Sequence, residues 1–138
     1  MARDSITESQ DQVAERGEPV IRSAPMPADM NGNGDIFGGW VLSQMDIAGG
    51  IIAARRAQGR VVTVAVDAMT FHQPIKVGDI VSIYGRVIRV GRTSMAVKME
   101  TIVARRLDPT EIKVTEGVYT YVAIDENGKP RPVPVGAK

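Results

Sequence analysis

One carboxylate of the sequence lies among residues whose types suit carbonyl chemistry. The segment NGNGDIFGGW (31–40) holds four glycines, two asparagines and Asp35, directly before a long apolar run. At the start of a helix, Gly38 and Gly39 would leave their amide N–H groups open to bind a developing oxyanion. Asp35 would then be close enough to activate water or to attack the same carbon. The alternative is that Asp35 is only the N-terminal cap of the helix.

Three further polar residues are candidates for the same site. Asn33 belongs to the same loop and is a candidate for substrate binding. Asp46 lies in the apolar body of the expected helix, where an unsatisfied carboxylate would be costly. It is either catalytic or, as we favour, a structural carboxylate satisfied by backbone or arginine. His72, the single histidine, either contacts a ligand or, as we favour, makes a structural hydrogen bond.

Other site motifs are incomplete in this region. The segment DMNGNG (29–34) matches the first half of a calcium-binding loop, but Trp40 stands where the bidentate glutamate belongs. No Gly-Lys-Ser/Thr follows, as a phosphate-binding loop requires, and the third glycine of a dinucleotide fingerprint is missing. Ser43 lies in VLSQM, which does not match the G-x-S-x-G pattern of a hydrolase nucleophile. We therefore expect neither a metal ion nor a separate cofactor.

Composition and charge limit the classes of function. The 138 residues suffice for one domain with its own core. A net charge of +1 and only six aromatic residues argue against a basic nucleic-acid surface with stacking platforms. The absence of cysteine excludes disulfides and a thiolate nucleophile. The sequence shows no signal peptide and no apolar run near the ~20 residues that span a bilayer, so we expect a cytoplasmic protein without a membrane partner.

Turn signals and periodicity predict the elements that must position these residues. An almost wholly apolar helix is expected from Gly38 to about Gln58, with Gly59 as its C-terminal cap. The Gly49–Gly50 pair predicts a close approach of this helix to a neighbouring backbone. Strands are expected within 18–23 and at 60–71, 79–90, 92–106 and 111–124.

This order of elements predicts an α+β fold in which one antiparallel sheet wraps a central helix that is covered on nearly all sides. The domain is expected at 18–126. A flexible N-terminal tail at 1–17 is expected before it, and a Pro-rich C-terminal tail at 127–138 is expected to trail over the surface.

Three segments, in order, resemble one protein family. They are MPADMNGNGDIFGGWVLSQMDIAGG (26–50), GRVVTVAVDAMTFHQPIKVGDIV (59–81) and VGRTSM (90–95). Together they resemble the YciA-type acyl-CoA thioesterases, which are small bacterial hotdog-fold proteins. The resemblance implies a hotdog fold, a dimer or a trimer of dimers, an active site at the subunit interface, and hydrolysis of acyl-CoA thioesters. Coenzyme A would then be part of the substrate.

The resemblance also implies roles for individual residues. Asp35 would be the catalytic carboxylate, and the amides near Gly38 and Gly39 would bind the oxyanion. Related hotdog enzymes use an acid at the helix position of Asp46. The VGRTSM segment corresponds to the part of the family that meets the coenzyme, so its phosphates would be bound by residues of this hairpin: Arg89, Arg92, Thr93 and Ser94. A solvated hairpin is the alternative for these four residues.

Two other functions are compatible with a fold of this kind. A non-catalytic module that binds acyl-CoA or an acyl carrier would keep the fold without turnover. A dehydratase of the same fold relies on a histidine with an acid on or near the central helix, and the expected helix contains no histidine. The sequence therefore favours a thioesterase over a binding module, and both over a dehydratase.

Overall fold

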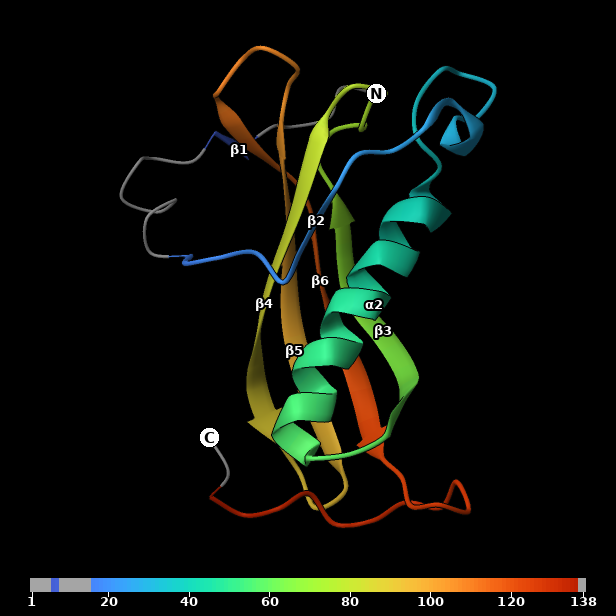
Figure 1. Ribbon diagram of the computed structural model, residues 1–138, viewed down its shortest axis with the longest axis vertical. Helices are drawn as coiled ribbons and strands as arrows, with labels where there is room; N and C mark the ends of the chain where they lie inside the picture. Colours follow the sequence, from blue (N-terminus) through green and yellow to red (C-terminus); the bar gives the residue numbers. More distant parts are fainter. Residues whose placement is uncertain (1–5, 8–15, 137–138) are drawn as a thin grey trace.

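The computed structural model describes residues 6–7 and 16–136 of the chain. Within this part, one long helix, α2 (Gly38–Ala57), lies across a curved antiparallel sheet (Figure 1). A short 3-10 helix, η1 (Pro27–Asp29), precedes it. The strands are β1 (Ile6–Thr7), β2 (Ile21–Ser23), β3 (Val61–Phe71), β4 (Ile80–Val90), β5 (Ser94–Ala104) and β6 (Glu111–Ala123). This is the predicted α+β arrangement of a sheet wrapped around a helix.

The sheet is antiparallel at every described pairing. The strand order is β1–β6–β5–β4–β2, and β3 also pairs with β6, along the residues that follow the β1 contact. The four long strands begin and end within two residues of their predicted positions. Short turn segments between the runs explain this agreement, and the β4–β5 and β5–β6 connections are hairpins between paired strands.

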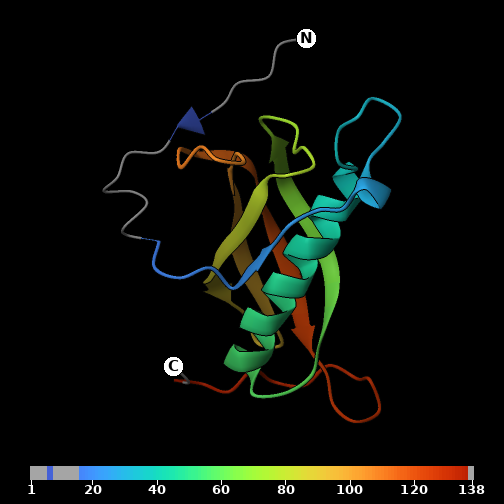
Figure 2. The same ribbon diagram turned by 45° about the horizontal axis from the view of Figure 1, so that its top comes forward.

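Helix α2 buries one face against the sheet and leaves another face open. Met45, Ala48 and Ala53 are fully buried, whereas the Ile47 side chain is 53% exposed. The prediction that the helix is covered on nearly all sides is therefore wrong for a single protomer. Figure 2 shows the physical reason, which is that the sheet curves around only one side of α2. Ile47 is the large apolar side chain of α2 that is exposed on this side.

At Gly49 the helix comes very close to β5 and β6. A Cβ atom at this position would overlap the Tyr121 hydroxyl and would lie 2.8 Å from Met99 Cε. A close approach does occur at Gly49, but the predicted partner is wrong, because the neighbours are side chains and not backbone. At Gly50 the nearest atom would be 4.0 Å away, so this second glycine is not required by packing within the protomer.

The two ends of α2 differ from their predicted caps. The N-cap residue is Phe37, which makes no side-chain capping bond. Asp35 is therefore not the helix cap that was the alternative to a catalytic role. At the other end, the residue in the left-handed conformation is Gln58, with φ of 55°, and not Gly59. The Gly59 amide still donates to the Ala54 carbonyl at 3.1 Å, so both residues close the last turn.

Strand β3 forms an edge of the sheet and carries exposed apolar side chains. It pairs with β6 on one side only, among the described residues. Val62, Val64 and Val66 are all exposed along its 11 residues. A long apolar edge of this kind is a template for pairing with another strand. Strand β3 lies beside α2 in both ribbon views (Figures 1 and 2).

The Pro-rich C-terminal segment, described up to residue 136, contacts the domain through Val133 and Pro134. Val133 is only 5% exposed, and its amide donates to the Arg92 carbonyl at 2.8 Å. Arg56 donates from Nη1 to the Pro134 carbonyl at 2.7 Å. The segment is therefore tied to the domain around residues 131–134, while 127–130 and 135–136 are exposed, and it runs along the end of the sheet where α2 stops (Figures 1 and 2). Most of the predicted N-terminal tail, 1–5 and 8–15, lies outside the described residues.

Candidate active site

A pocket opens where helix α2 begins. It lies between the glycine-rich loop (residues 31–37) and the β3–β4 loop (residues 72–79), and its volume is about 300 Å³. Polar and apolar side chains share its wall, which is suited to a ligand with an apolar body and one polar centre. Its lining residues are Asn31, Asn33, Asp35, Ile36, Gly38, Val41, Phe71, Gln73, Pro74, Ile75 and Thr115.

Asn31 folds the glycine-rich loop. Its side-chain Oδ1 accepts hydrogen bonds from the amides of Asn33 at 2.8 Å and Asp35 at 3.2 Å. Gly34 takes a φ of +82°, which L side chains rarely adopt and which closes the turn. The sequence interpretation named Asn33 and missed Asn31. The signal was present, because an asparagine followed by alternating glycines is typical of an Asx turn.

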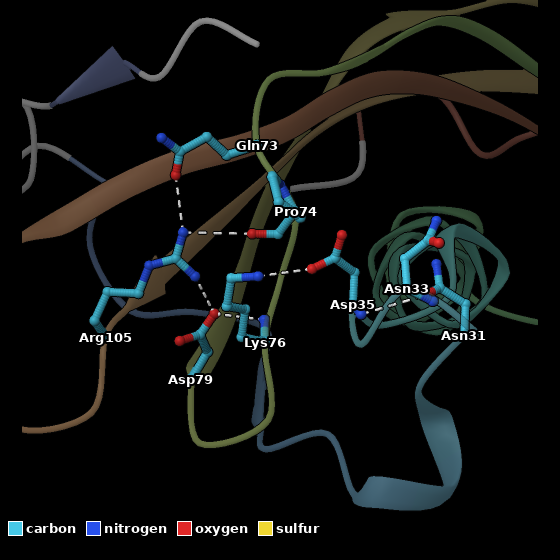
Figure 3. A network of polar contacts seen from close by, with 8 residues as sticks. All are labelled: Asn31, Asn33, Asp35, Gln73, Pro74, Lys76, Asp79 and Arg105. Atoms are coloured by element: carbon cyan, nitrogen blue, oxygen red, sulfur yellow. Dashed lines mark hydrogen bonds and ion pairs between the residues drawn. The ribbon is translucent and has the colours of Figure 1, made fainter. Parts of the chain in front are cut away.

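The Asp35 carboxylate is in the pocket wall, as a site residue must be, and it has a cationic partner. Lys76 Nζ lies 2.7 Å from Asp35 Oδ1, with the Asp35 side chain 22% exposed and the Lys76 side chain 58% exposed. Figure 3 shows this pair bridging the two loops. No local pattern indicates this pairing, since the two residues are 41 positions apart in the sequence.

Arg105 holds the β3–β4 loop in place through several hydrogen bonds. It donates to the carboxylate of the buried Asp79, to Gln73 Oε1 at 2.8 Å and to the Pro74 carbonyl at 3.4 Å. Asp79 Oδ2 also accepts from the Lys76 amide at 2.8 Å. The wall that carries Lys76 is therefore held by a part-buried network around the buried Asp79 carboxylate, seen on the left of Figure 3.

Of the two glycines at the start of α2, Gly38 lines the pocket and Gly39, the next residue, is not among the lining residues. The first amides of a helix have no partner within the helix. A Cβ at Gly38 would lie 3.8 Å from the Phe71 ring, and a Cβ at Gly39 would meet no atom within 4 Å. The two glycines bring no side chain to cover this helix start, so it can receive the oxygen of a carbonyl group, where the helix dipole favours negative charge.

Asp46 lies elsewhere in the protomer, about two turns along α2, which is ~12 Å of helix from Gly38. Its Oδ1 accepts from Thr63 Oγ1 at 2.6 Å and from Tyr121 Oη at 3.0 Å. Burial and the negative charge of Asp46 raise the pKa of Tyr121, so this phenol stays a donor. The predicted partners, backbone or arginine, are replaced by two hydroxyls. Thr63, on the exposed edge strand β3, was missed by sequence reasoning.

His72 is hydrogen-bonded and lies outside the residues that line the pocket. Its Nε2 is 2.9 Å from Glu116 Oε2, and its amide donates to the Val114 carbonyl at 2.7 Å. The hydrogen bond from His72 is the main cause that lowers the pKa of Glu116. This geometry fits the structural role that the sequence interpretation favoured, while ligand contact by His72 stays a prediction.

The predicted coenzyme-binding residues lie at the far end of the sheet. Arg89 and Arg92 are exposed at the β4–β5 hairpin, with Thr93 and Ser94 beside them. Strand β4 runs from the β3–β4 loop to this hairpin over 11 residues, or ~36 Å at the usual rise. The hairpin and Asp35 therefore do not share a site within one protomer.

Two features are absent from the described part of the chain. It contains no group of three His, Cys, Asp or Glu residues that could hold a metal ion. No helix within it is long and apolar enough to cross a membrane. The polar side chains that line the pocket carry carboxylate, amide and hydroxyl groups.

Comparisons with known proteins agree on one family. The family model for the thioesterase superfamily matches residues 33–107. The acyl-CoA thioester hydrolase YciA of Salmonella typhimurium is 51% identical over 123 residues, which cover 87% of this chain and 92% of that protein. YciA of Escherichia coli K12 is 50% identical over 123 residues, with 87% and 93% covered.

Solved structures of thioesterases are also similar to this chain in fold. The hexameric thioesterase y2039 from Yersinia pestis matches with 53% identity and a TM-score of 0.82 over 87% of this chain and 98% of that one. Cj0915 of Campylobacter jejuni, a hexameric hotdog-fold thioesterase, matches with 41% identity and a TM-score of 0.81 over 87% and 92%. The resemblance found in the sequence is confirmed: the chain belongs to the thioesterase superfamily, among the YciA-type acyl-CoA thioester hydrolases, and has the hotdog fold.

Proposed function

We propose that this chain hydrolyses acyl-CoA thioesters to a carboxylic acid and free coenzyme A. The observation that carries the proposal is the pocket at the start of α2, where open helix amides and carboxylate chemistry meet an apolar wall. The acyl group would lie in this pocket with its carbonyl oxygen toward the amides of Gly38 and Gly39. A thiol is a better leaving group than an alcohol because it is more acidic, so the site needs no strong general acid.

The assembly proposed from the fold is a homo-oligomer built on β3. Two copies of this strand can pair antiparallel, which would satisfy the open edge and cover Val62, Val64 and Val66. The open side of α2, with Ile47, would be covered by the same contact. A dimer of this kind fits the hexameric relatives as a trimer of dimers.

Such a dimer would bring Asp46 to the pocket of the other copy. Pairing about the middle of Val61–Phe71 places Thr63 of one protomer opposite Met69 of the other, two residues before Phe71. Asp46 is bonded to Thr63, and Gly38 lies against Phe71. In the dimer, the two-fold axis would therefore place the Asp46 carboxylate of one protomer near the start of α2 in the partner. Within a single protomer, Asp46 and the start of α2 are about two helical turns apart.

We therefore assign the reaction to two protomers. The Gly38 and Gly39 amides of one protomer would hold the carbonyl oxygen, and Asp46 of the partner subunit would activate water or attack the carbonyl carbon. In the first route, water adds to the carbon, its proton passes to the carboxylate, and the thiolate leaves and takes up that proton. Asp35 is the second carboxylate of the site, and its ion pair with Lys76 makes it the less available of the two.

The coenzyme end of the substrate supplies a separate prediction. Arg92→Ala should raise KM for acyl-CoA and change kcat little, because a phosphate contact far from the thioester is present in both ground and transition states. The matched control is an acyl-pantetheine substrate, which lacks the nucleotide phosphates and should not distinguish the two enzymes. An unchanged KM for acyl-CoA at low salt would remove Arg92 from the substrate site.

A thiol-release assay tests the proposed function itself. Purified protein is given short, medium and long acyl-CoA substrates, and release of free coenzyme A is followed with a thiol reagent. Saturable turnover is the expected result. Binding of acyl-CoA without turnover would instead support the alternative, a non-catalytic acyl-CoA or acyl-carrier binding module.

A further inference from the structure

The ion pair between Asp35 and Lys76 has no part in the reaction proposed above, yet it joins the two walls of the pocket. We propose that this pair is a clasp that sets the width of the acyl pocket, and that Lys76 is thereby a specificity-determining residue for acyl size. Lys76 does not line the pocket, so it would act by positioning the walls and not by touching the acyl group. The inference rests on the proposed function for the identity of the ligand.

Each wall is held by its own hydrogen bonds. On one side, Asn31 Oδ1 accepts two amides of the glycine-rich loop, at 2.8 and 3.2 Å. On the other side, Arg105 and Asp79 fix the β3–β4 loop, and Asp79 also accepts the Lys76 amide at 2.8 Å. Each of the two loops is therefore held by its own hydrogen bonds. The contacts between the loops then set the width of the pocket.

In the described part of the chain, the two walls meet at two polar contacts. One is a backbone hydrogen bond from the Ile36 amide to the Ile75 carbonyl at 2.8 Å. The other is the ion pair, at 2.7 Å between Lys76 Nζ and Asp35 Oδ1. The backbone bond joins two residues that line the pocket. The ion pair joins their chain neighbours, Asp35, which also lines the pocket, and Lys76, which does not. Loss of the ion pair would leave the backbone bond as a hinge for the walls.

The ion pair is weak enough to open for a large acyl group, so it would select by acyl size and would not exclude large groups completely. The Lys76 side chain is 58% exposed, and exposed ion pairs are weak and screened by salt. The pocket, at about 300 Å³, lies at the small end of small-molecule sites. A short acyl group would fit with the clasp closed, while a long one would have to open it.

The test compares Lys76→Met, which keeps an unbranched side chain without charge, with the matched control Lys76→Arg, which keeps the charge. The readout is the ratio of kcat/KM for lauroyl-CoA to that for butyryl-CoA. We expect Lys76→Met to raise this ratio by about threefold to fivefold, the size expected for loss of one exposed ion pair, and Lys76→Arg to keep the wild-type ratio. Salt at about 1 M should raise the wild-type ratio and leave that of Lys76→Met unchanged.

A second measurement does not depend on activity. Amide hydrogen exchange in segments 31–37 and 72–79 should be faster in Lys76→Met than in wild type, and unchanged in Lys76→Arg. If the wild-type protein turned over no acyl-CoA, the proposed function would fail while exchange still tested the clasp. Wild-type exchange in both segments of Lys76→Met, or an unchanged substrate ratio in an active enzyme, would overturn the clasp.

Discussion

Turnover of acyl-CoA should fall by about 10² to 10⁴ in Asp46→Asn, the range typical of a positioned acid–base group. The side-chain amide oxygen of the introduced asparagine can still accept the Thr63 and Tyr121 hydroxyls, which bind Asp46 at 2.6 and 3.0 Å. Folding and assembly should therefore survive while the base or nucleophile is lost. The measurement is kcat by thiol release, with melting temperature and sedimentation recorded on the same preparation.

Asp35→Asn is the matched comparison, because it removes the other carboxylate of the site. The introduced amide can still accept a hydrogen bond from Lys76, and Asp35 caps no helix, so the fold should be unaffected. We expect a loss of no more than about tenfold, well below the effect of removing a reacting group. The reverse ranking, with Asp46→Asn near wild type and Asp35→Asn almost inactive, would make Asp35 the catalytic carboxylate, as the loop sequence suggested.

The second large effect is expected from Gly38→Pro, which removes one amide N–H from the helix start. Removing an oxyanion donor typically costs about 10² to 10³ in kcat. Proline is tolerated at the first position of a helix, and Phe37 has a ψ of 136°, within the range that the residue before a proline prefers. The helix should therefore remain while the donor is lost.

Gly38→Ala is the control for this variant. Its Cβ would lie 3.8 Å from the Phe71 ring, which is an ordinary van der Waals contact, and its amide is retained. It should keep most of the wild-type kcat. Near-normal turnover in Gly38→Pro would show that this amide does not bind the oxyanion.

Local patterns in the sequence were sufficient to predict most of the fold. Alternation and turn residues specified the four long strands, and the apolar run specified α2, because both signals act over a few neighbouring residues. The glycine at position 49 correctly indicated a close approach, since no larger residue fits beside Tyr121. The composition of the Pro-rich end is that of a tail and did not indicate that Val133 is buried with the core, although most of the segment is exposed as expected.

The site was predicted in part, and the missing part consists of long-range partners. The loop from Asn31 and the helix start at Gly38 are local features, and they do line one pocket. The pairing of Asp35 with Lys76 spans 41 positions and that of Asp46 with Thr63 spans 17, so neither is encoded in a local pattern. The open side of α2 was missed for a related reason. The sequence pattern of an apolar helix is the same whether the sheet of its own protomer or a second copy of the chain covers it.

The central claim is that each active site combines the helix start of one protomer with Asp46 of the partner subunit. Complementation tests it directly: Gly38→Pro and Asp46→Asn chains are unfolded, mixed in equal amounts and refolded together, and kcat is compared with that of each variant alone. If the site is shared, half of the helix starts in the mixture are intact, because they belong to Asp46→Asn chains. Random pairing gives half of these chains a Gly38→Pro partner, whose Asp46 is intact. About one quarter of wild-type turnover should therefore return. If both groups act within one protomer, every chain carries one lesion, and a mixture no more active than the separate variants would contradict the account.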